Sequence, residues 1–261
     1  MTAASEAAIA FEHVSKRYSD GSRAALDDVS LVIAPRTFVA IVGPSGSGKT
    51  TLLRLVNRLA DPTHGTVQVD GGDVTAADPV QLRRRIGYVF QGIGLFPHMT
   101  VAENIGITPK LIGWDAARIA QRVDGLLDLV RLGRSYRDRY PQQLSGGERQ
   151  RIGVARALAA EPKIMLMDEP FGALDPITRD GLARDYRALH EQLGLTTAMI
   201  THDMTEALLL ADRIVLIRAG RIVANGTPAE LMQPGADPFV TEMLDMPLRQ
   251  AERLQALRSQ A

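Results

Sequence analysis

The 261-residue sequence contains no cysteine. Without thiols it can form no disulfide, thiolate zinc site or iron–sulfur cluster, and it offers no cysteine nucleophile. It also has no surplus of either charge, because 30 Lys and Arg residues balance 30 Asp and Glu residues. That balance argues against a polycationic protein that coats nucleic acid and against an acidic disordered tail.

Long apolar runs are absent as well. The best of them, residues 38–42 and 214–217, are far shorter than the roughly 20 residues that a membrane-spanning helix needs. The first residues have neither the basic start nor the apolar centre of a secretory signal. We therefore expect a cytosolic location, with any membrane role exerted through a partner protein.

Aromatic side chains, on which nucleic-acid bases could stack, are scarce at 5% of residues. We expect the basic clusters at residues 83–85 and 134–139 to be solvated faces, and we expect no nucleic-acid partner.

What is present falls into three zones. Up to about residue 91, short apolar segments bounded by Gly, Pro and Asp are typical of strands, and one helix is expected over 49–60. From about 100 to 160 the pattern is helical, with helices expected over 115–130 and 147–160. After that, strands and helices alternate, which predicts a parallel sheet covered by helices. The expected elements there are strands 164–169 and 196–201, helices 176–193 and 204–211, a hairpin 214–226 and a last helix 238–261.

The strongest motif is Gly-Pro-Ser-Gly-Ser-Gly-Lys-Thr at residues 43–50, which fits G-x-x-x-x-G-K-[ST] between an apolar strand and a helix. Its glycines let backbone N–H groups surround phosphate oxygens, and the helix N-terminus favours the anion. Lys49 is expected to bind the β- and γ-phosphates, and Thr50 to ligate Mg²⁺. We assign nucleotide binding here to Gly43, Pro44, Ser45, Gly46, Ser47, Gly48, Lys49, Thr50 and Thr51.

Two carboxylates end the apolar strand that begins at Ile164. Ligands of open α/β sheets bind beyond the carboxyl ends of the strands. Asp168 is suited to orient Mg²⁺ or its water, and Glu169 to polarise an attacking water. Taken alone, such a pair is as often a solvated strand end, but the phosphate loop upstream favours the catalytic interpretation.

Residues 144–151, Leu-Ser-Gly-Gly-Glu-Arg-Gln-Arg, distinguish among classes of phosphate-loop protein. Here the sequence resembles the ATP-binding cassette (ABC) family, whose signature is Leu-Ser-Gly-Gly-Gln, and the resemblance extends from about Ile9 to Leu244. Glu148 replaces the last residue of that signature. A small-molecule kinase or GTPase would have no use for this segment.

The resemblance implies an α/β P-loop NTPase fold with a mixed, mainly parallel core sheet, an N-terminal antiparallel β subdomain and an inserted helical subdomain. The implied divisions are 1–91, 92–160, 161–244 and a helical tail, 245–261. It also implies that two cassettes dimerise head to tail. Each would complete the partner's ATP site with its signature residues, which are Ser145, Gly146, Gly147 and Glu148.

Further roles follow from the resemblance. Gln91 matches the glutamine loop, which positions Mg²⁺ and water, so the implied Mg²⁺ ligands are Thr50, Gln91 and Asp168. His202 matches the histidine that contacts the γ-phosphate, and Tyr18 the aromatic that stacks on adenine. Each has a structural alternative.

Each of these residues could instead have a purely structural role. Tyr18 could be a strand aromatic, His202 a core histidine and Gln91 a turn residue. Ser145 could simply cap the following helix.

Residues 92–105 resemble the segment with which importer cassettes contact their permease. An exposed Leu95-Phe96-Pro97 triplet would otherwise be an unexplained apolar patch. More narrowly, this segment and residues 168–179 resemble the quaternary-amine (osmoprotectant) uptake group, whose substrates include glycine betaine, choline and carnitine.

The resemblance therefore implies an ATPase on the cytoplasmic face of the membrane, with a permease and, indirectly, a solute-binding protein as partners. We expect no regulatory domain after the cassette. A soluble non-transport ATPase and an exporter cassette are the alternatives.

Overall fold

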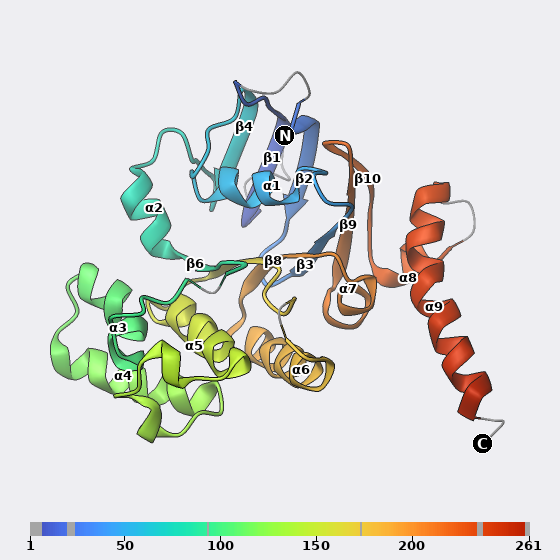
Figure 1. Ribbon diagram of the computed structural model, residues 1–261. Coiled ribbons are helices and arrows are strands. Elements are labelled where there is room, and N and C mark those ends of the chain that lie inside the picture. The colour runs from blue at the N-terminus through green and yellow to red at the C-terminus, as the bar shows by residue number, and fades with distance from the viewer. Residues whose placement is uncertain (1–6, 20–23, 93, 173, 234–236, 259–261) are drawn as a thin grey trace.

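The computed structural model describes residues 7–19, 24–92, 94–172, 174–233 and 237–258 (Figure 1). Within these residues the strands form two sheets. One is antiparallel, with strand order β2-β1-β4-β5, and the other has the order β10-β9-β3-β8-β7-β6. The expected α/β fold, with an amino-terminal antiparallel part and a mixed core sheet, is therefore confirmed.

The core sheet is parallel from β9 through to β6, and β10 pairs antiparallel with β9. Its strands are β3 (Phe38–Val42), β6 (Ile86–Val89), β7 (Ile164–Asp168), β8 (Thr196–Thr201), β9 (Arg213–Arg218) and β10 (Arg221–Gly226). Because the carboxyl ends of parallel neighbours share an edge, the residues that follow β3, β6, β7 and β8 lie along one side of this sheet.

The antiparallel sheet and helix α1 (Lys49–Val56) cover one face of the core sheet (Figure 1). The antiparallel strands are β1 (Ile9–Lys16), β2 (Leu26–Ile33), β4 (His64–Val69) and β5 (Gly72–Asp73). Val39 and Ile41 of β3 share a buried cluster with Leu52 of α1 and Ile9 of β1. The phosphate loop, which precedes α1, is thus held between two sheets.

The opposite face of the core sheet is covered by α5 (Gly146–Leu158), α6 (Pro176–Leu193) and α7 (Met204–Leu210). Here Phe38 and Ala40 of β3 share a cluster with Tyr186 of α6. Successive strand residues point to opposite faces, so a strand buried throughout, as β3 is, packs on both sides.

The expected helical zone is observed beside the core (Figure 1). It contains α3 (Val101–Leu111), α4 (Ala116–Leu129) and α5, with the short turns η2 (Arg134–Tyr136) and η3 (Pro141–Gln143). Side chains of Thr100, Asp115 and Ser145 cap the three helices by accepting hydrogen bonds from backbone N–H groups.

Several boundaries differ from the sequence predictions. The helix expected over 49–60 ends at Val56, because Arg58 has φ +47° and leaves the helical conformation. The first zone contains a second helix, α2 (Pro79–Arg85), whose signals are the N-cap Asp78 and Pro79 in the first turn. The chain ends with α8 (Pro228–Leu231) and α9 (Pro238–Arg258), and residues 259–261 of the expected last helix lie outside the described part.

Membrane-spanning helices are not found in the part of the chain that the structure describes, since no helix there combines the necessary length and apolar character.

Candidate functional site

The phosphate loop connects β3 to α1 and is packed tightly against its surroundings. A Cβ at Gly43 would lie 2.0 Å from the carbonyl oxygen of Ile217, and a Cβ at Gly48, where φ is +105°, would lie 2.3 Å from that of Ala25. Neither position can therefore accept a side chain without a shift of the backbone. The backbone N–H of Gly220 donates to the carbonyl of Ser47 at 3.0 Å, which ties the loop to the β9–β10 turn.

Lys49 lies inside this loop. Its Nζ donates to the carbonyl oxygens of Gly43, at 2.7 Å, and Pro44, at 2.9 Å. Burial lowers the pKa of Lys49, and the negative charges of Glu169 and Asp168 oppose that shift. The hydroxyl of Ser47 is buried and has no hydrogen-bond partner among the described residues. An unpaired buried hydroxyl in a loop of this kind suits a polar ligand.

Asp168 ends β7 next to the first turn of α1. The hydroxyl of Thr50 donates to Oδ1 of Asp168 at 3.4 Å. Burial raises the pKa of Asp168, the Thr50 hydrogen bond opposes this, and the charge of Glu169 adds to it. Hydroxyl and carboxylate oxygens are the ligands that Mg²⁺ prefers, so these two side chains fit the expected metal.

Glu169 stands between two of the predicted catalytic residues. Gln91, beyond the end of β6, donates from Nε2 to Oε2 of Glu169 at 3.1 Å. His202, directly after β8, has Nδ1 3.4 Å from the same oxygen. Glu169 has φ +47°, a conformation that is uncommon outside glycine. The structure therefore brings Gln91, Glu169 and His202 to one point on the predicted side of the sheet, and Gln91 itself lies in a turn.

Arg179, in the first turns of α6, was not among the predicted site residues. Its Nη2 donates to the carbonyl of Leu174 at 3.1 Å, and its Nη1 lies 3.6 Å from Oδ2 of Asp203. Its Nε lies 3.8 Å from Oε1 of Glu206. One guanidinium thus joins the segment that follows Glu169 to the segment that follows His202. The available sequence signal was an arginine four residues after Asp175, and its spacing alone predicts no such contact.

Glu206 completes this network. Its Oε2 accepts a hydrogen bond from the hydroxyl of Thr201 at 2.7 Å, immediately before His202 in the chain. Burial raises the pKa of Glu206. Because Thr201 also accepts from the N–H of Asp203 at 3.0 Å, the residues on both sides of His202 are fixed.

The signature segment forms the N-terminus of α5. Ser145 is the N-cap, as its structural alternative proposed, and a glutamate completes the capping box. Oε2 of Glu148 accepts from the N–H of Ser145 at 2.7 Å, and its Oε1 accepts from the hydroxyl of Tyr136 at 2.5 Å. The Tyr136 hydrogen bond is the main cause of the lowered pKa of Glu148. The Glu148 carboxylate is therefore engaged inside its own chain.

Of the two signature glycines, Gly147 faces α6 and Gly146 faces the segment just before it. A Cβ at Gly147 would lie 2.7 Å from Cγ2 of Thr178, and one at Gly146 would lie 4.0 Å from Leu174. The signature thus lies against the segment that Arg179 holds. Ala173, in the middle of that segment, is outside the described residues.

Tyr18 lies beyond the end of β1, so the strand-aromatic alternative is wrong. The residue is 37% exposed, and Nζ of Lys16 lies 5.0 Å from the ring centroid. The face of an exposed aromatic ring at this position is accessible to a flat base.

The expected exposed triplet in residues 92–105 is only partly observed, and Ile93 lies outside the described residues. Phe96 is 40% exposed, whereas Leu95 packs partly against the core. Leu95 is therefore only partly exposed, because one side of it packs against the buried cluster. The buried amide of Asn104 fixes the loop by accepting from the N–H of Phe96 at 2.8 Å and donating to the carbonyl of Met99 at 3.0 Å.

Comparison with known proteins identifies relatives of this arrangement. The family model described as ABC transporter matches residues 26–172. The chain is 52% identical over 236 residues to the choline transport ATP-binding protein OpuBA of Bacillus subtilis, covering 90% of this chain and 62% of that protein. It is 46% identical to the glycine betaine uptake system ATP-binding protein YehX of Escherichia coli, covering 90% and 75%.

A solved structure is also similar. It is the dimeric, post-hydrolysis state of the ATP-binding cassette MJ0796 bound to ADP and Pi, with TM-score 0.77 and 34% identity over 84% of this chain and 98% of that one. The chain spans about three fifths of the length of the first curated relatives, between 59% and 62%.

Proposed function

Because the chain belongs to the ABC transporter family, we propose that it is the ATP-hydrolysing subunit of an importer that takes up a quaternary-amine osmoprotectant. The observation that carries the ATPase proposal is that Oε2 of Glu169 is within reach of both Gln91 and His202, beside the phosphate loop. The reaction is ATP plus water to ADP plus phosphate.

The loop binds the triphosphate. Its backbone N–H groups and the α1 N-terminus attract phosphate oxygens, and Lys49 supplies a positive charge at their centre. Because Lys49 is held by the carbonyls of Gly43 and Pro44, its ammonium is positioned before nucleotide arrives. Tyr18 stacks on the adenine base.

Mg²⁺ would be held by Thr50 and Asp168 with Gln91 nearby, and when bound it would neutralise phosphate charge. No cluster of three or more His, Cys, Asp and Glu side chains suited to a metal occurs in the described residues. That is the pattern expected for Mg²⁺, which usually takes one or two carboxylates and leaves its other positions to water and phosphate.

Glu169 orients the attacking water through its carboxylate. Gln91 donates a hydrogen bond to this carboxylate and so fixes the orientation of the Glu169 oxygens that accept from the water. His202 lies on the other side, where its imidazole can donate to a γ-phosphate oxygen. Gln91, Glu169 and His202, which follow β6, β7 and β8, would thus lie around the phosphate bond that is hydrolysed.

A second cassette would complete the site. We propose that Ser145, Gly146 and Gly147 of the partner contact the γ-phosphate, with the N-terminus of α5 directed at it. Glu148 acts indirectly, because its carboxylate is already used to cap that helix and to bind Tyr136. The MJ0796 cassette, which this chain resembles, is a dimer.

The permease would dock on a groove next to residues 92–105. This groove of about 350 Å³ is lined by apolar side chains that are unusually exposed, among them Leu59, Phe90, Phe96 and Leu111. Their exposed fractions lie between 40% and 59%. Such a surface suits the apolar side of a short partner helix. It would place the subunit at the cytoplasmic face of the membrane.

The proposed substrate class rests on the relatives, OpuBA and YehX, which are named for choline and glycine betaine transport. The permease and its solute-binding protein select the solute. The cassette therefore indicates the substrate class only through its relationship to these proteins.

Purification from membranes tests the whole proposal. The tagged full-length chain should copurify with a permease, and the partner solute-binding protein should bind glycine betaine, choline or carnitine. Recovery of a permease whose binding protein takes an inorganic oxyanion would contradict the substrate class. Recovery with ribosomes or DNA and without a permease would contradict the importer.

A further inference from the structure

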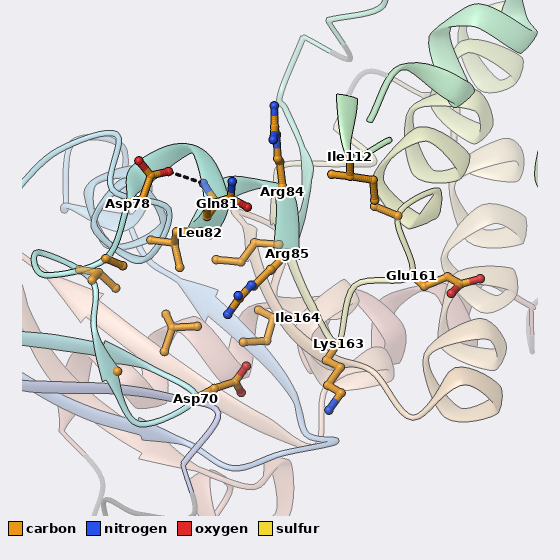
Figure 2. Close-up of a pocket in the computed structure, with 16 residues that line it drawn as sticks. Asp70, Asp78, Gln81, Leu82, Arg84, Arg85, Ile112, Glu161, Lys163 and Ile164 are labelled. Carbon is orange, nitrogen blue, oxygen red and sulfur yellow. Dashed lines mark hydrogen bonds between the residues drawn. The ribbon is translucent and has the colours of Figure 1, made fainter. Parts of the chain in front are cut away.

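A cavity of about 680 Å³ lies away from the phosphate loop, at the opposite ends of the strands that carry the catalytic residues (Figure 2). Ile86 and Ile164, the first residues of β6 and β7, form part of its wall, whereas Gln91 and Glu169 follow the other ends of these strands. The volume is in the range typical of small-molecule sites.

The cavity lies where three parts of the molecule meet. Asp70 and Val74 come from the antiparallel sheet and its following loop, and Leu82 comes from α2. Ile112 follows α3 and Glu161 follows α5, both in the helical zone. Ligand sites occur preferentially at such junctions, because a ligand there can contact several elements at once.

Its floor is apolar and buried. Val74, Leu82, Ile86 and Ile164 line it, and each is at most 8% exposed. Ile112, at 36% exposure, adds an apolar wall. A flat apolar group that packs against this floor would bury its own apolar surface and the exposed part of Ile112.

Three cations, Arg84, Arg85 and Lys163, line the cavity. Within the described residues, none of these three side chains has a hydrogen-bond or ion-pair partner. Figure 2 shows Arg85 extending into the hollow. The guanidinium of Arg83, by contrast, donates hydrogen bonds to the carbonyl oxygens of Asn57 and Arg58.

The acidic residues do not cancel these charges. Glu161 pairs with Arg118 and Arg122, and Asp78 caps α2 by accepting from the N–H of Gln81 at 2.7 Å. A hydrogen bond from an N–H does not neutralise a carboxylate, so Asp78 and Asp70 both keep their charge. In the described residues, three cations therefore stand against two carboxylates that have no ion-pair partner, and the unpaired charge of the lining is net positive.

We propose that this cavity is a second ligand site, which binds an organic phosphate with a flat apolar body. The phosphate lies between Arg85 and Lys163, and the body lies on the floor formed by Leu82, Ile86 and Ile164. Asp70 accepts a hydrogen bond from a hydroxyl or amino group of the ligand. This site does not depend on ATP hydrolysis or on a permease.

The test uses the full chain with labelled isoleucine methyl groups and saturating Mg-ADP, which occupies the phosphate loop. Titration with 1-naphthyl phosphate should shift the methyl signals of Ile86, Ile112 and Ile164 in a saturable way. The signals of Ile105 and Ile152, in the other buried cluster, should stay unchanged. Shifts confined to other isoleucines, or no saturation, would overturn the proposal.

Variants then test Arg85 and Lys163, the two cations between which the phosphate is placed. Arg85→Gln and Lys163→Gln should each weaken binding roughly tenfold, the effect of losing one charge-assisted contact. Arg184→Gln is the matched control, because Arg184 has the same charge but lies on α6, does not line the cavity and pairs with Asp180 at the surface. Equal affinity in all three variants would contradict the site.

The apolar floor has its own test. Ala77→Phe should fill part of the cavity and reduce naphthyl phosphate binding without changing any charge. Inorganic phosphate should bind far more weakly than naphthyl phosphate. If the two bind equally, the floor has no role and the proposed ligand class is wrong. Thermal unfolding of each variant confirms that the fold is intact.

Discussion

Nδ1 of His202 and Oε2 of Glu169 lie 3.4 Å apart, although 33 residues separate them in the chain. Their strands, β8 and β7, are parallel neighbours, so both residues leave the sheet at the same edge. A water held by the carboxylate would therefore be close to the imidazole. This geometry makes the glutamate the most informative residue to change.

Glu169→Gln should abolish steady ATP turnover, because an amide cannot accept the proton of water as a carboxylate can. Nucleotide binding should survive, since the phosphate loop is unchanged. ATP should then hold two chains together, and size-exclusion chromatography should show a dimer that dissociates when ATP is removed. A variant that remains monomeric with ATP and hydrolyses it at the normal rate would refute the catalytic assignment.

Lys49→Ala should weaken ATP binding by roughly tenfold to a hundredfold, the usual effect of losing a hydrogen bond to a charged group. Isothermal titration calorimetry measures this directly. Lys110→Ala, at an exposed position on α3, is the matched control and should bind ATP normally. Unchanged affinity in Lys49→Ala would remove the lysine from the nucleotide site.

Arg179→Gln should lower kcat roughly tenfold to a hundredfold with little change in the KM for ATP, because the arginine positions His202 and the segment around Leu174 without touching nucleotide. Arg179→Lys should restore part of kcat, since it keeps one charge near Asp203 and Glu206. Steady-state ATPase kinetics separate the two constants.

The control for Arg179 is Arg184→Gln on the same helix. Arg184 pairs only with Asp180 in the described structure, and both side chains are exposed, so kcat should not change. If Arg179→Gln raises KM and leaves kcat intact, the arginine contributes to binding instead of positioning.

Phe96→Asp should uncouple transport while sparing basal ATPase activity, because it places a charge on the proposed permease surface. The measurement is substrate uptake into vesicles together with ATP hydrolysis. Leu209→Asp, which changes a side chain that is 73% exposed on α7, should leave uptake intact. Loss of folding in Phe96→Asp, seen by thermal unfolding, would show instead that this residue belongs to the core.

Much of the site could be predicted from sequence because its parts are local. The phosphate loop is one continuous octapeptide, and Asp168 and Glu169 end one continuous apolar strand. Their grouping with Gln91 and His202 needed only the rule that parallel strands share a carboxyl edge. For these residues the structure adds distances and orientations.

The remaining features depend on contacts between distant residues. The guanidinium of Arg179 contacts Leu174 and Glu206, which lie in different parts of the chain, and no sequence pattern predicts these contacts. The partial burial of Leu95 likewise depends on how the loop folds back on the core. Glu148 looked like a nucleotide contact because its neighbours match a signature, yet Tyr136, twelve residues away, occupies its carboxylate.

The amide of Asn104 separates the path of its loop from the side chains on the loop surface. This one buried side chain bonds to the backbone at Phe96, Met99 and Thr100, so it sets the path of the loop without using any exposed side chain. Phe96 and Pro97 can therefore be substituted without altering that path. If this loop is the proposed permease surface, its chemistry can be changed independently of the ATP site.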